Sequence, residues 1–386
     1  MDQNDKFAFV KTALAERSQQ QRLRTLTAVD PVDAVYLQRR GKTLLNFSAN
    51  DYLGLSKHPA LIAAAQDYSQ RYGSSATASR LVTGSYTIHE QLEAKLAAAC
   101  GREAALLFSS GFQANTTILA AILDRQSLVL CDRLVHSSLL QGALLSGAKL
   151  VRYAHNDLDQ LESRLKESTA YHRTVIVSET LFSMDGDCSD VQAMAQLAER
   201  YGAILYLDDA HALGVFGEAG MGLAAHQAGV DLTIGTFGKA FGAFGAFVTC
   251  SQQLRDYLIN CCAGFIYTTA LPPAVIGAID AALTLMPDLE PERTDLREQS
   301  EKLRANLHAL GYDTGKSCSQ IVPILLGSEA RAISLSRWLE AAGILATPIR
   351  PPTVAAGASR IRLALSSCHT ARHYDHLLNA IQSWHG

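Results

Sequence analysis

The feature that most constrains the fold is a regular alternation, from about residue 103 onward, of short apolar runs with longer helical patterns. Apolar runs of this length between helices are typical of parallel strands covered on both faces. One helix is expected to begin after Asp190 as its N-cap and to end before Gly202. The sequence therefore predicts an α/β fold with a mostly parallel sheet, whose strands are expected at 104–108, 128–131, 149–153, 174–178, 203–207, 232–235 and 246–250.

The region after about Pro273 has a different character. A connecting helix is expected at 274–286, followed by a boundary rich in proline and charge at 287–295. Beyond the boundary the pattern predicts a small α+β domain, with helices at 296–311, 329–343 and 372–384 and strands at 321–326, 344–349 and 360–365. The predicted organisation is an N-terminal arm (1–45), a large α/β domain (46–287) and a small C-terminal domain (288–386).

Charge and cysteine usage narrow the class of protein. The 34 basic and 37 acidic side chains give a net charge of −3, which suggests neither nucleic acid nor a membrane surface as a partner. The uncharged stretches 104–123 and 257–279 are interrupted by polar residues or prolines, and the N-terminus lacks the features of a signal peptide. The eight scattered cysteines are expected to be small buried hydrophobes in a reducing compartment. A cytoplasmic protein is predicted.

Lys239 is unusual because it lies among glycines, alanines and phenylalanines in the stretch 233–247. A phosphate-binding P-loop is excluded because Thr233 replaces its first glycine and Ala240 follows the lysine. The glycine spacing is also a poor match to a dinucleotide fingerprint. Two interpretations remain: a surface lysine beside tight turns, or a desolvated lysine that forms a Schiff base.

Acidic and imidazole groups follow the strand expected at 203–207. Asp208, Asp209 and His211 come at its carboxyl end, where open α/β sheets bind ligands. A carboxylate there suits a protonated pyridine nitrogen, and a histidine three residues on can reach the same ring. Taken alone, this cluster is equally compatible with a metal site or a helix cap.

Two more strand ends carry suitable groups. Small residues from Ser109 to Gly111 open a helix, where free N–H groups bind phosphate, although a simple cap at Ser109 or Ser110 explains them as well. His136 follows the strand expected at 128–131. A phosphate cradle, an imidazole ring, an acid and an amine at successive strand ends together predict a pyridoxal 5′-phosphate site.

With these residues assembled, the sequence resembles the α-oxoamine synthases, a branch of the fold-type I pyridoxal-phosphate transferases. The likeness implies an aspartate-aminotransferase-like large domain and covers nearly the whole chain. It is carried by the stretches NFSANDYLGL (46–55), ASRLVTGSYTIHEQLE (78–93), LLFSSGFQAN (106–115), AHNDLDQLE (154–162), SETLFSMDGD (178–187), LDDAHALGVFGEAGMG (207–222), GTFGKAFG (235–242), FIYTTALPPA (265–274) and IRPPTVAAGASRIRLALS (349–366).

The resemblance implies roles for the residues already singled out. Lys239 forms the Schiff base and moves the Cα proton, and Asp208 pairs with the pyridine nitrogen. His211 hydrogen-bonds the ring hydroxyl, and His136 stacks on the ring.

It also implies further contacts that the residues alone did not suggest. Gly111 and Phe112 provide backbone contacts, Thr236 holds phosphate, Ser183 contacts the cofactor and Glu179 lies nearby. The substrate carboxylate is expected at Asn50 and Arg362, with Arg360 as the alternative arginine if the strand register differs. The residues expected to face the acyl substrate or an adjacent subunit are Arg24, Tyr267, Arg350 and Thr353.

Within this family, the stretch IRPPTV and the short arm favour the branch that condenses L-alanine with a pimeloyl thioester in biotin synthesis, as a homodimer. The acyl carrier, coenzyme A or acyl carrier protein, stays open. Two loops depart from the family pattern, because 73–86 has fewer glycines and 355–357 lacks a preceding proline. The alternatives are a sibling synthase using glycine or serine, an aminotransferase, and a non-catalytic binding or regulatory protein.

Overall fold

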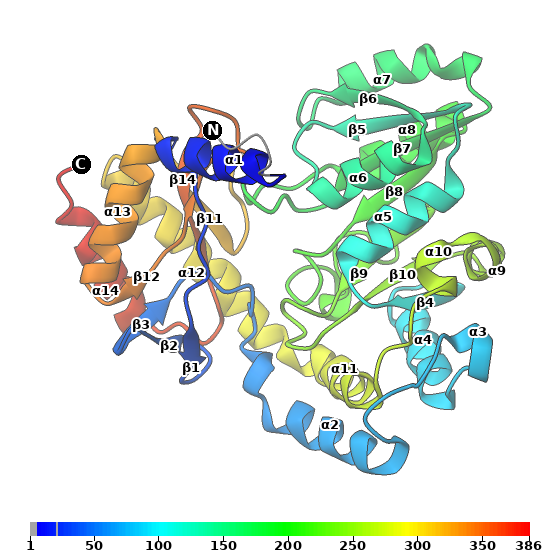
Figure 1. Ribbon diagram of the computed structural model, residues 1–386, viewed down its shortest axis with the longest axis horizontal. Coiled ribbons are helices and arrows are strands. Elements are labelled where there is room, and N and C mark those ends of the chain that lie inside the picture. Colours follow the sequence, from blue (N-terminus) through cyan, green and yellow to red (C-terminus); the bar gives the residue numbers. More distant parts are fainter. Residues whose placement is uncertain (1–5, 21) are drawn as a thin grey trace.

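The structure, a computed structural model, describes residues 6–20 and 22–386. Figure 1 shows a larger body built on a central sheet and a smaller body that contains the C-terminal part of the chain. Residues 1–5 and Gln21 of the predicted arm lie outside the described residues. The predicted domain boundaries stay predictions, and the arm contributes helix α1 (Ala8–Gln19) and strands that pair near the smaller body.

The larger body contains a seven-stranded sheet in the order β4-β10-β9-β8-β7-β5-β6. Strand β10 is antiparallel to both of its neighbours, and the other pairs are parallel. The mostly parallel sheet predicted from the sequence is therefore confirmed. Its strands are β4 (Ala104–Phe108), β5 (Ser127–Asp132), β6 (Lys149–Tyr153), β7 (Arg173–Glu179), β8 (Ile204–Asp208), β9 (Leu232–Thr236) and β10 (Ala246–Cys250).

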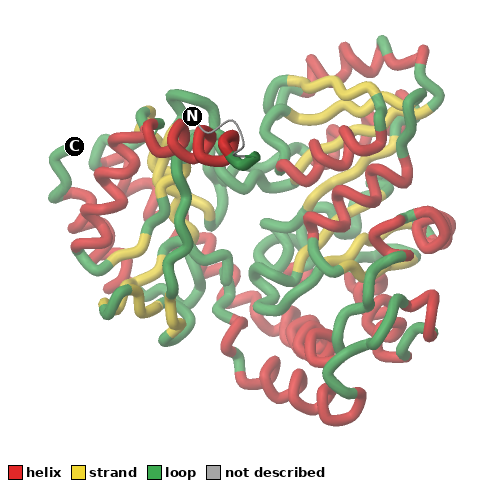
Figure 2. The backbone as a smooth tube through the Cα atoms, in the orientation of Figure 1, coloured by secondary structure: helices red, strands yellow, loops and turns green. Residues whose placement is uncertain are grey.

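Successive side chains of a strand point to opposite sides of the sheet. Because these strands are continuous apolar runs, both faces of the sheet are apolar. In β7, Val175 and Val177 join the core beneath α5, α6 and α9, whereas Ile176 joins the core beneath α7 and α8. Figure 2 shows these helices in red around the yellow sheet. Their bounds are α5 (Gly111–Ile122), α6 (Ser137–Ser146), α7 (Leu158–Lys166), α8 (Val191–Tyr201) and α9 (Gln252–Cys261).

The predicted ends of α8 are confirmed. The side chain of Asp190 accepts a hydrogen bond from the backbone N–H of Ala193, as an N-cap does. Gly202 follows the helix with a φ of 61°, a left-handed conformation that suits glycine.

The smaller body has two sheets. One sheet has the strand order β11-β14-β13, and the other has the order β1-β2-β3-β12. Strands near the N-terminus therefore pair with the C-terminal part of the chain. The helices and strands are α12 (Glu290–Ala309), α13 (Glu329–Ala341), α14 (Ala371–Gln382), β1 (Val29–Pro31), β2 (Tyr36–Arg39), β3 (Lys42–Asn46), β11 (Ile321–Gly327), β12 (Ile344–Leu345), β13 (Pro348–Ile349) and β14 (Ser359–Ala364).

Two expectations for this region are wrong. The single strand predicted at 344–349 is split into β12 and β13, which belong to different sheets because β12 pairs with β3 whereas β13 pairs with β14. The helix expected at 296–311 begins earlier, because the stretch 287–295 forms a short 3₁₀ turn, η4 (Met286–Leu289), followed directly by the start of α12 at Glu290. Pro287 and Pro291 fit there because each lies in the first turn of its helix.

The remaining helices lie in the connections between these elements. No helix of the described chain combines the length and apolar composition needed to cross a bilayer. These helices are η1 (Leu55–Lys57), α2 (Pro59–Tyr72), α3 (Arg80–Thr83), α4 (Thr87–Ala99), η2 (Ser168–Ala170), η3 (Glu218–Gly220), α10 (Ala263–Ile266) and α11 (Pro273–Leu285).

The expectation that the cysteines are buried is only partly met. All eight are free thiols, and four of them are buried. Cys188 is half-buried, and the exposed Cys261, Cys318 and Cys368 correct the prediction. Those three lie at a helix end or in loops on the surface of the fold, outside the hydrophobic core.

Candidate active site

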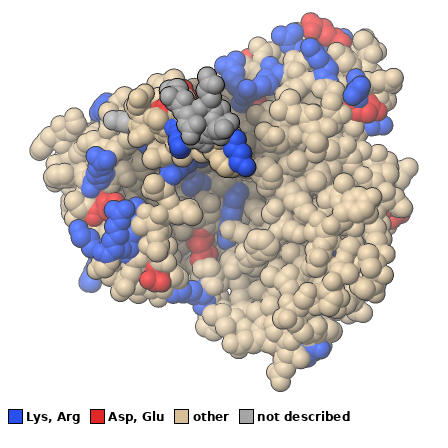
Figure 3. All heavy atoms as spheres, in the orientation of Figure 1, with Lys and Arg blue, Asp and Glu red and all other residues tan. Residues whose placement is uncertain are grey.

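A cavity of about 390 Å³ lies at the carboxyl ends of the parallel strands, between the two bodies. Figure 3 shows Lys and Arg side chains gathered around the hollow between these bodies. The smaller body closes one side with residues of β13 and β14. The predicted site residues that line the cavity are Asn50, Gly111, Phe112, His136, Glu179, Ser183, Asp208, His211, Thr236, Lys239 and Arg362.

Lys239 provides an amine without a partner. Its ammonium group makes no hydrogen bond or ion pair with any residue of the described chain, and the side chain is half-buried. Desolvation lowers the pKa of Lys239 to about 8, because it outweighs the nearby Asp208 and Glu179 carboxylates that act to raise it. At neutral pH a useful fraction of this amine is therefore unprotonated, as a base or nucleophile requires.

Asp208 ends β8 and is held from two sides. The side-chain amide of Asn115 donates to Oδ2 at 2.7 Å, and the backbone N–H of Ala210 donates to Oδ1 at 3.0 Å. Sequence reasoning missed Asn115, although it lies in the quoted stretch 106–115. The neighbouring Asp209 is directed elsewhere, because it accepts hydrogen bonds from the backbone of Leu223 and Ala224.

His211 is neutral in this setting. Burial, together with the positive charges of Lys239 and Arg362, lowers its pKa well below the usual value. The hydroxyl of Tyr52 lies 2.6 Å from Nδ1, which leaves Nε2 as the ring nitrogen available to a ligand. Tyr52 is a second residue that sequence reasoning missed; it belongs to the quoted stretch 46–55.

His136 stands at the N-terminus of α6. Its Nδ1 lies 2.8 Å from the hydroxyl of Ser138, and its backbone N–H donates to Oε1 of Glu179 at 2.6 Å. Partial desolvation lowers the pKa of His136 and outweighs the charge of Asp208, which acts to raise it, and Lys239 lowers it further. The imidazole is therefore available in the cavity as an uncharged flat surface. Burial also raises the pKa of Glu179 well above its usual value, and the charge of Asp208 adds to this effect.

The N-terminus of α5 is suited to phosphate. Ser110 caps the helix by accepting from the backbone N–H of Gln113, so the structural alternative for this serine is correct. The N–H groups of Gly111 and Phe112 have no hydrogen-bond partner in the described chain and line the cavity. The hydroxyl of Thr236 donates to the carbonyl of Gly245, so it has to release that bond before it can donate to a phosphate oxygen.

Arg362 is anchored so that one end of its guanidinium remains open. Nε donates to the carbonyl of Ser183 at 2.6 Å, and Nη2 donates to Oδ1 of Asn50 at 3.1 Å. Nη1 has no partner among the described residues. Arg360, the alternative arginine, instead pairs with Asp185 at 2.6 Å and does not line the cavity.

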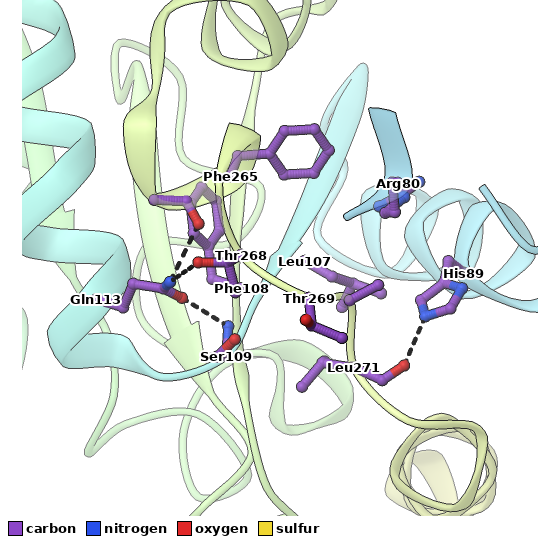
Figure 4. A pocket seen from close by; sticks show the side chains of 12 residues that line it. Arg80, His89, Leu107, Phe108, Ser109, Gln113, Phe265, Thr268, Thr269 and Leu271 are labelled. Carbon is purple, nitrogen blue, oxygen red and sulfur yellow. Dashed lines mark hydrogen bonds between the residues drawn. The ribbon is translucent and has the colours of Figure 1, made fainter. Parts of the chain in front are cut away.

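Four predicted residues lie outside the cavity lining. Arg24 donates to the hydroxyl of Thr353 at 3.0 Å on the smaller body, and Arg350 belongs to the same loop. Tyr267 is 84% exposed on the larger body. It belongs to the segment 264–271, which lines a small second pocket shown in Figure 4, where the amide of Gln113 reaches Thr268 and Gly264.

A metal site was one alternative for the cluster Asp208, Asp209 and His211. The described residues contain no group of three or more acidic, histidine or cysteine side chains arranged to hold a metal ion. The unpaired amine, the fixed carboxylate and the free N–H groups of α5 instead fit pyridoxal phosphate. Lys239, Asp208 and the backbone of Gly111 and Phe112 are the groups that correspond to its aldehyde, ring nitrogen and phosphate.

Comparison with known proteins agrees with this geometry. The family model of aminotransferase class I and II matches residues 42–381. The chain belongs to this family. Pyridoxal phosphate is accordingly the cofactor, and the predicted fold-type I transferase fold is confirmed.

Relatives within the family place the chain among its acyltransferases. It is 49% identical to a putative 8-amino-7-oxononanoate synthase of Desulfosudis oleivorans, covering 98% of this chain and 99% of that one. It is 50% identical to the 8-amino-7-oxononanoate synthase of Gluconacetobacter diazotrophicus, covering 97% and 96%. The serine palmitoyltransferase of Sphingomonas wittichii is similar in structure, with a TM-score of 0.92, 28% identity and 98% of each chain covered. The resemblance to the α-oxoamine synthases is confirmed.

Proposed function

We propose that this acyltransferase condenses L-alanine with a pimeloyl thioester, with loss of carbon dioxide, to give 8-amino-7-oxononanoate for biotin synthesis. One observation carries the proposal: the amine of Lys239, which has no partner among the described residues, lies in the same cavity as the open end of the Arg362 guanidinium. The names of relatives at 49% and 50% identity support this substrate pair.

The cofactor, when bound, supplies an electron-withdrawing ring that stabilises negative charge on the α-carbon of the amino acid. Asp208, oriented by Asn115, keeps the ring nitrogen protonated. His211 donates or accepts at the ring hydroxyl through Nε2, with Tyr52 fixing the orientation of the imidazole. His136 would cover one ring face, Thr236 and the N-terminus of α5 would hold the phosphate end, and Ser183 would provide a further contact to the cofactor.

Lys239 acts as the base that removes the proton from the α-carbon of alanine. Its lowered pKa, about 8, allows it to accept that proton near neutral pH and to return it after decarboxylation.

The amino-acid carboxylate is assigned to Arg362 and Asn50. A guanidinium with a free terminal nitrogen suits a carboxylate, and its other contacts hold it rigid. The side chain of Glu179 accepts a hydrogen bond from the backbone N–H of His136, and this contact positions the loop that carries His136.

The acyl substrate is assigned to the residues beyond the cavity lining. Arg24, Thr353 and Arg350 on the smaller body and Tyr267 on the larger body would contact the acyl chain, its carrier or a second subunit. A homodimer in the cytoplasm, with coenzyme A or acyl carrier protein as the leaving group, completes the proposal.

The experiment is a competition. The cofactor-loaded protein is mixed with pimeloyl-CoA and equal amounts of L-alanine, glycine and L-serine, and the product mass is measured. A ketone that carries the carbons of alanine minus carbon dioxide is expected. A ketone derived from glycine or serine would replace the proposal by the sibling activity, which the structural similarity to serine palmitoyltransferase keeps as the second candidate.

A further inference from the structure

Two thiols face each other across the junction of the two bodies, outside the cavity. The sulfur atoms of Cys188 and Cys318 are 3.2 Å apart. Cys188 follows the turn after β7 in the larger body, and Cys318 precedes β11 in the smaller body. Cys318 is exposed, so a small molecule reaches it from solvent.

The backbones that carry these thiols are already fixed to one another. The N–H of Cys318 and the hydroxyl of Ser319 both donate to the carbonyl of Gly186, at 2.9 and 2.7 Å. A Cβ at Gly186 would lie 2.0 Å from the carbonyl oxygen of Ile321, so the two segments are in close contact. The pairing of the sulfurs is therefore a fixed feature of the fold.

The surroundings favour a reactive thiolate at Cys318. A hydrogen bond with Cys188 and the charge of Arg304 together lower the pKa of Cys318 to about 7, although burial and Asp187 act to raise it. The thiolate is the nucleophilic form of cysteine, and a resolving thiol next to it is typical of redox-sensitive sites.

We propose that Cys188 and Cys318 form a reversible disulfide when a hydroperoxide oxidises Cys318, and that this bond slows the enzyme. The Cys318 thiolate attacks one peroxide oxygen, the O–O bond breaks, the other oxygen leaves as hydroxide or alkoxide and takes up a proton, and a sulfenic acid forms. Cys188 then attacks the Cys318 sulfur, the S–S bond forms, and the S–O bond breaks with release of water. Two thiols lose two electrons and two protons, and the hydroperoxide is reduced.

The bond would disturb both walls of the cavity. A disulfide is about 2.05 Å long, so the two sulfur atoms have to approach by roughly 1.2 Å. On one side the turn carries Ser183, whose carbonyl holds Arg362. On the other side Gln320 donates to the carbonyl of His211 at 2.8 Å. Displacements of about 1 Å near a reacting centre lower turnover by up to about a hundredfold.

The test treats the holoenzyme with hydrogen peroxide and maps its peptides by mass without reduction. A peptide pair linking Cys188 to Cys318 is expected, together with at least a tenfold fall in turnover that dithiothreitol reverses. C188S should instead accumulate a sulfenic acid at Cys318 that dimedone labels. C261S, which removes another exposed thiol, should behave as the wild type.

The proposal is overturned if the linked peptide is absent, if other cysteines pair instead, or if the linked enzyme keeps full turnover. The effect on turnover rests on the proposed condensation, whereas the peptide masses do not. If the condensation itself fails, the linked peptide and a change in the absorbance of the bound cofactor still decide whether the thiols form a disulfide that reaches the site.

Discussion

At the scale of single residues, two adjacent aspartates have separate tasks. Asp208 faces the cavity and is held by Asn115, whereas Asp209 accepts hydrogen bonds from Thr180 and from the backbone of Leu223 and Ala224. Chain position does not distinguish them, because both follow the same strand. Their hydrogen-bond partners do.

Asp208→Asn should lower turnover by about 10²–10³-fold, since it removes the charge that stabilises the protonated ring nitrogen, with little loss of stability. Asp209→Asn is the matched control. It should lower the free energy of unfolding by about 1–3 kcal/mol, because the amide cannot accept all three hydrogen bonds. Turnover and urea unfolding are measured for both variants. Unchanged turnover in D208N would remove Asp208 from its assigned role.

The two arginines of β14 allow a similar comparison. Arg362→Lys should raise the KM for L-alanine by roughly 10–100-fold, because one guanidinium hydrogen bond to a carboxylate is lost. Arg360→Lys, which perturbs the ion pair with Asp185 outside the cavity, should leave that KM nearly unchanged. Steady-state kinetics with varied alanine decide between them. Equal effects in both variants would contradict the assignment of the carboxylate to Arg362.

At the scale of elements, His155 joins two loops that carry site residues. Its ring lies between Asp132, at the end of β5, and Asp187, in the turn after β7, at 3.0 and 2.8 Å. Burial acts to lower the pKa of His155, but the hydrogen bonds to Asp132 and Asp187 outweigh it and raise the pKa to about 10. The imidazolium therefore fixes the loop before His136 to the turn that contains Ser183.

This raised pKa predicts a pH-dependent stability. The contribution of His155 is complete below the unfolded pKa of about 6.5 and is lost as the pH rises to about 10. His155→Gln should lower the free energy of unfolding by about 1.5–3 kcal/mol at pH 6, and the difference should shrink toward pH 10. The control is His172→Gln at a more exposed ion pair with Asp124. A difference between wild type and H155Q that does not vary with pH would show that His155 is not a structural cation.

The same elements show what the sequence could predict. Strands β4 to β10 were predicted correctly because apolar runs are local signals, and the groups singled out at their ends line one cavity. Asn115 and Tyr52 were not singled out, because their partners Asp208 and His211 are 93 and 159 positions away and no local pattern encodes such contacts. The division of 344–349 into β12 and β13 depends on which strands lie alongside, and this too is not local information.

At the scale of the whole molecule, three exposed side chains form an apolar surface, and one of them, Phe112, lines the cavity. Val82 on α3 is 75% exposed, Tyr267 is 84% exposed, and Phe112 at the cavity wall is 52% exposed. Their segments are adjacent, since Ser79 donates to the carbonyl of Ile266 and the side chain of Gln113 donates to the carbonyl of Gly264. Large exposed apolar surfaces of this kind mark interaction sites.

We expect a second copy of the chain to bind this surface. The second copy would also complete the part of the site that binds the acyl substrate. Light scattering should give a mass of twice 41.6 kDa. Val82→Glu should shift the mass toward the monomer at micromolar concentration and lower turnover with it, because a buried unpaired charge opposes association. Leu145→Glu, at a 65% exposed leucine on α6, should remain dimeric. A wild-type protein that is monomeric yet fully active would mean that one chain provides the complete site, and the exposed apolar surface would then need another partner.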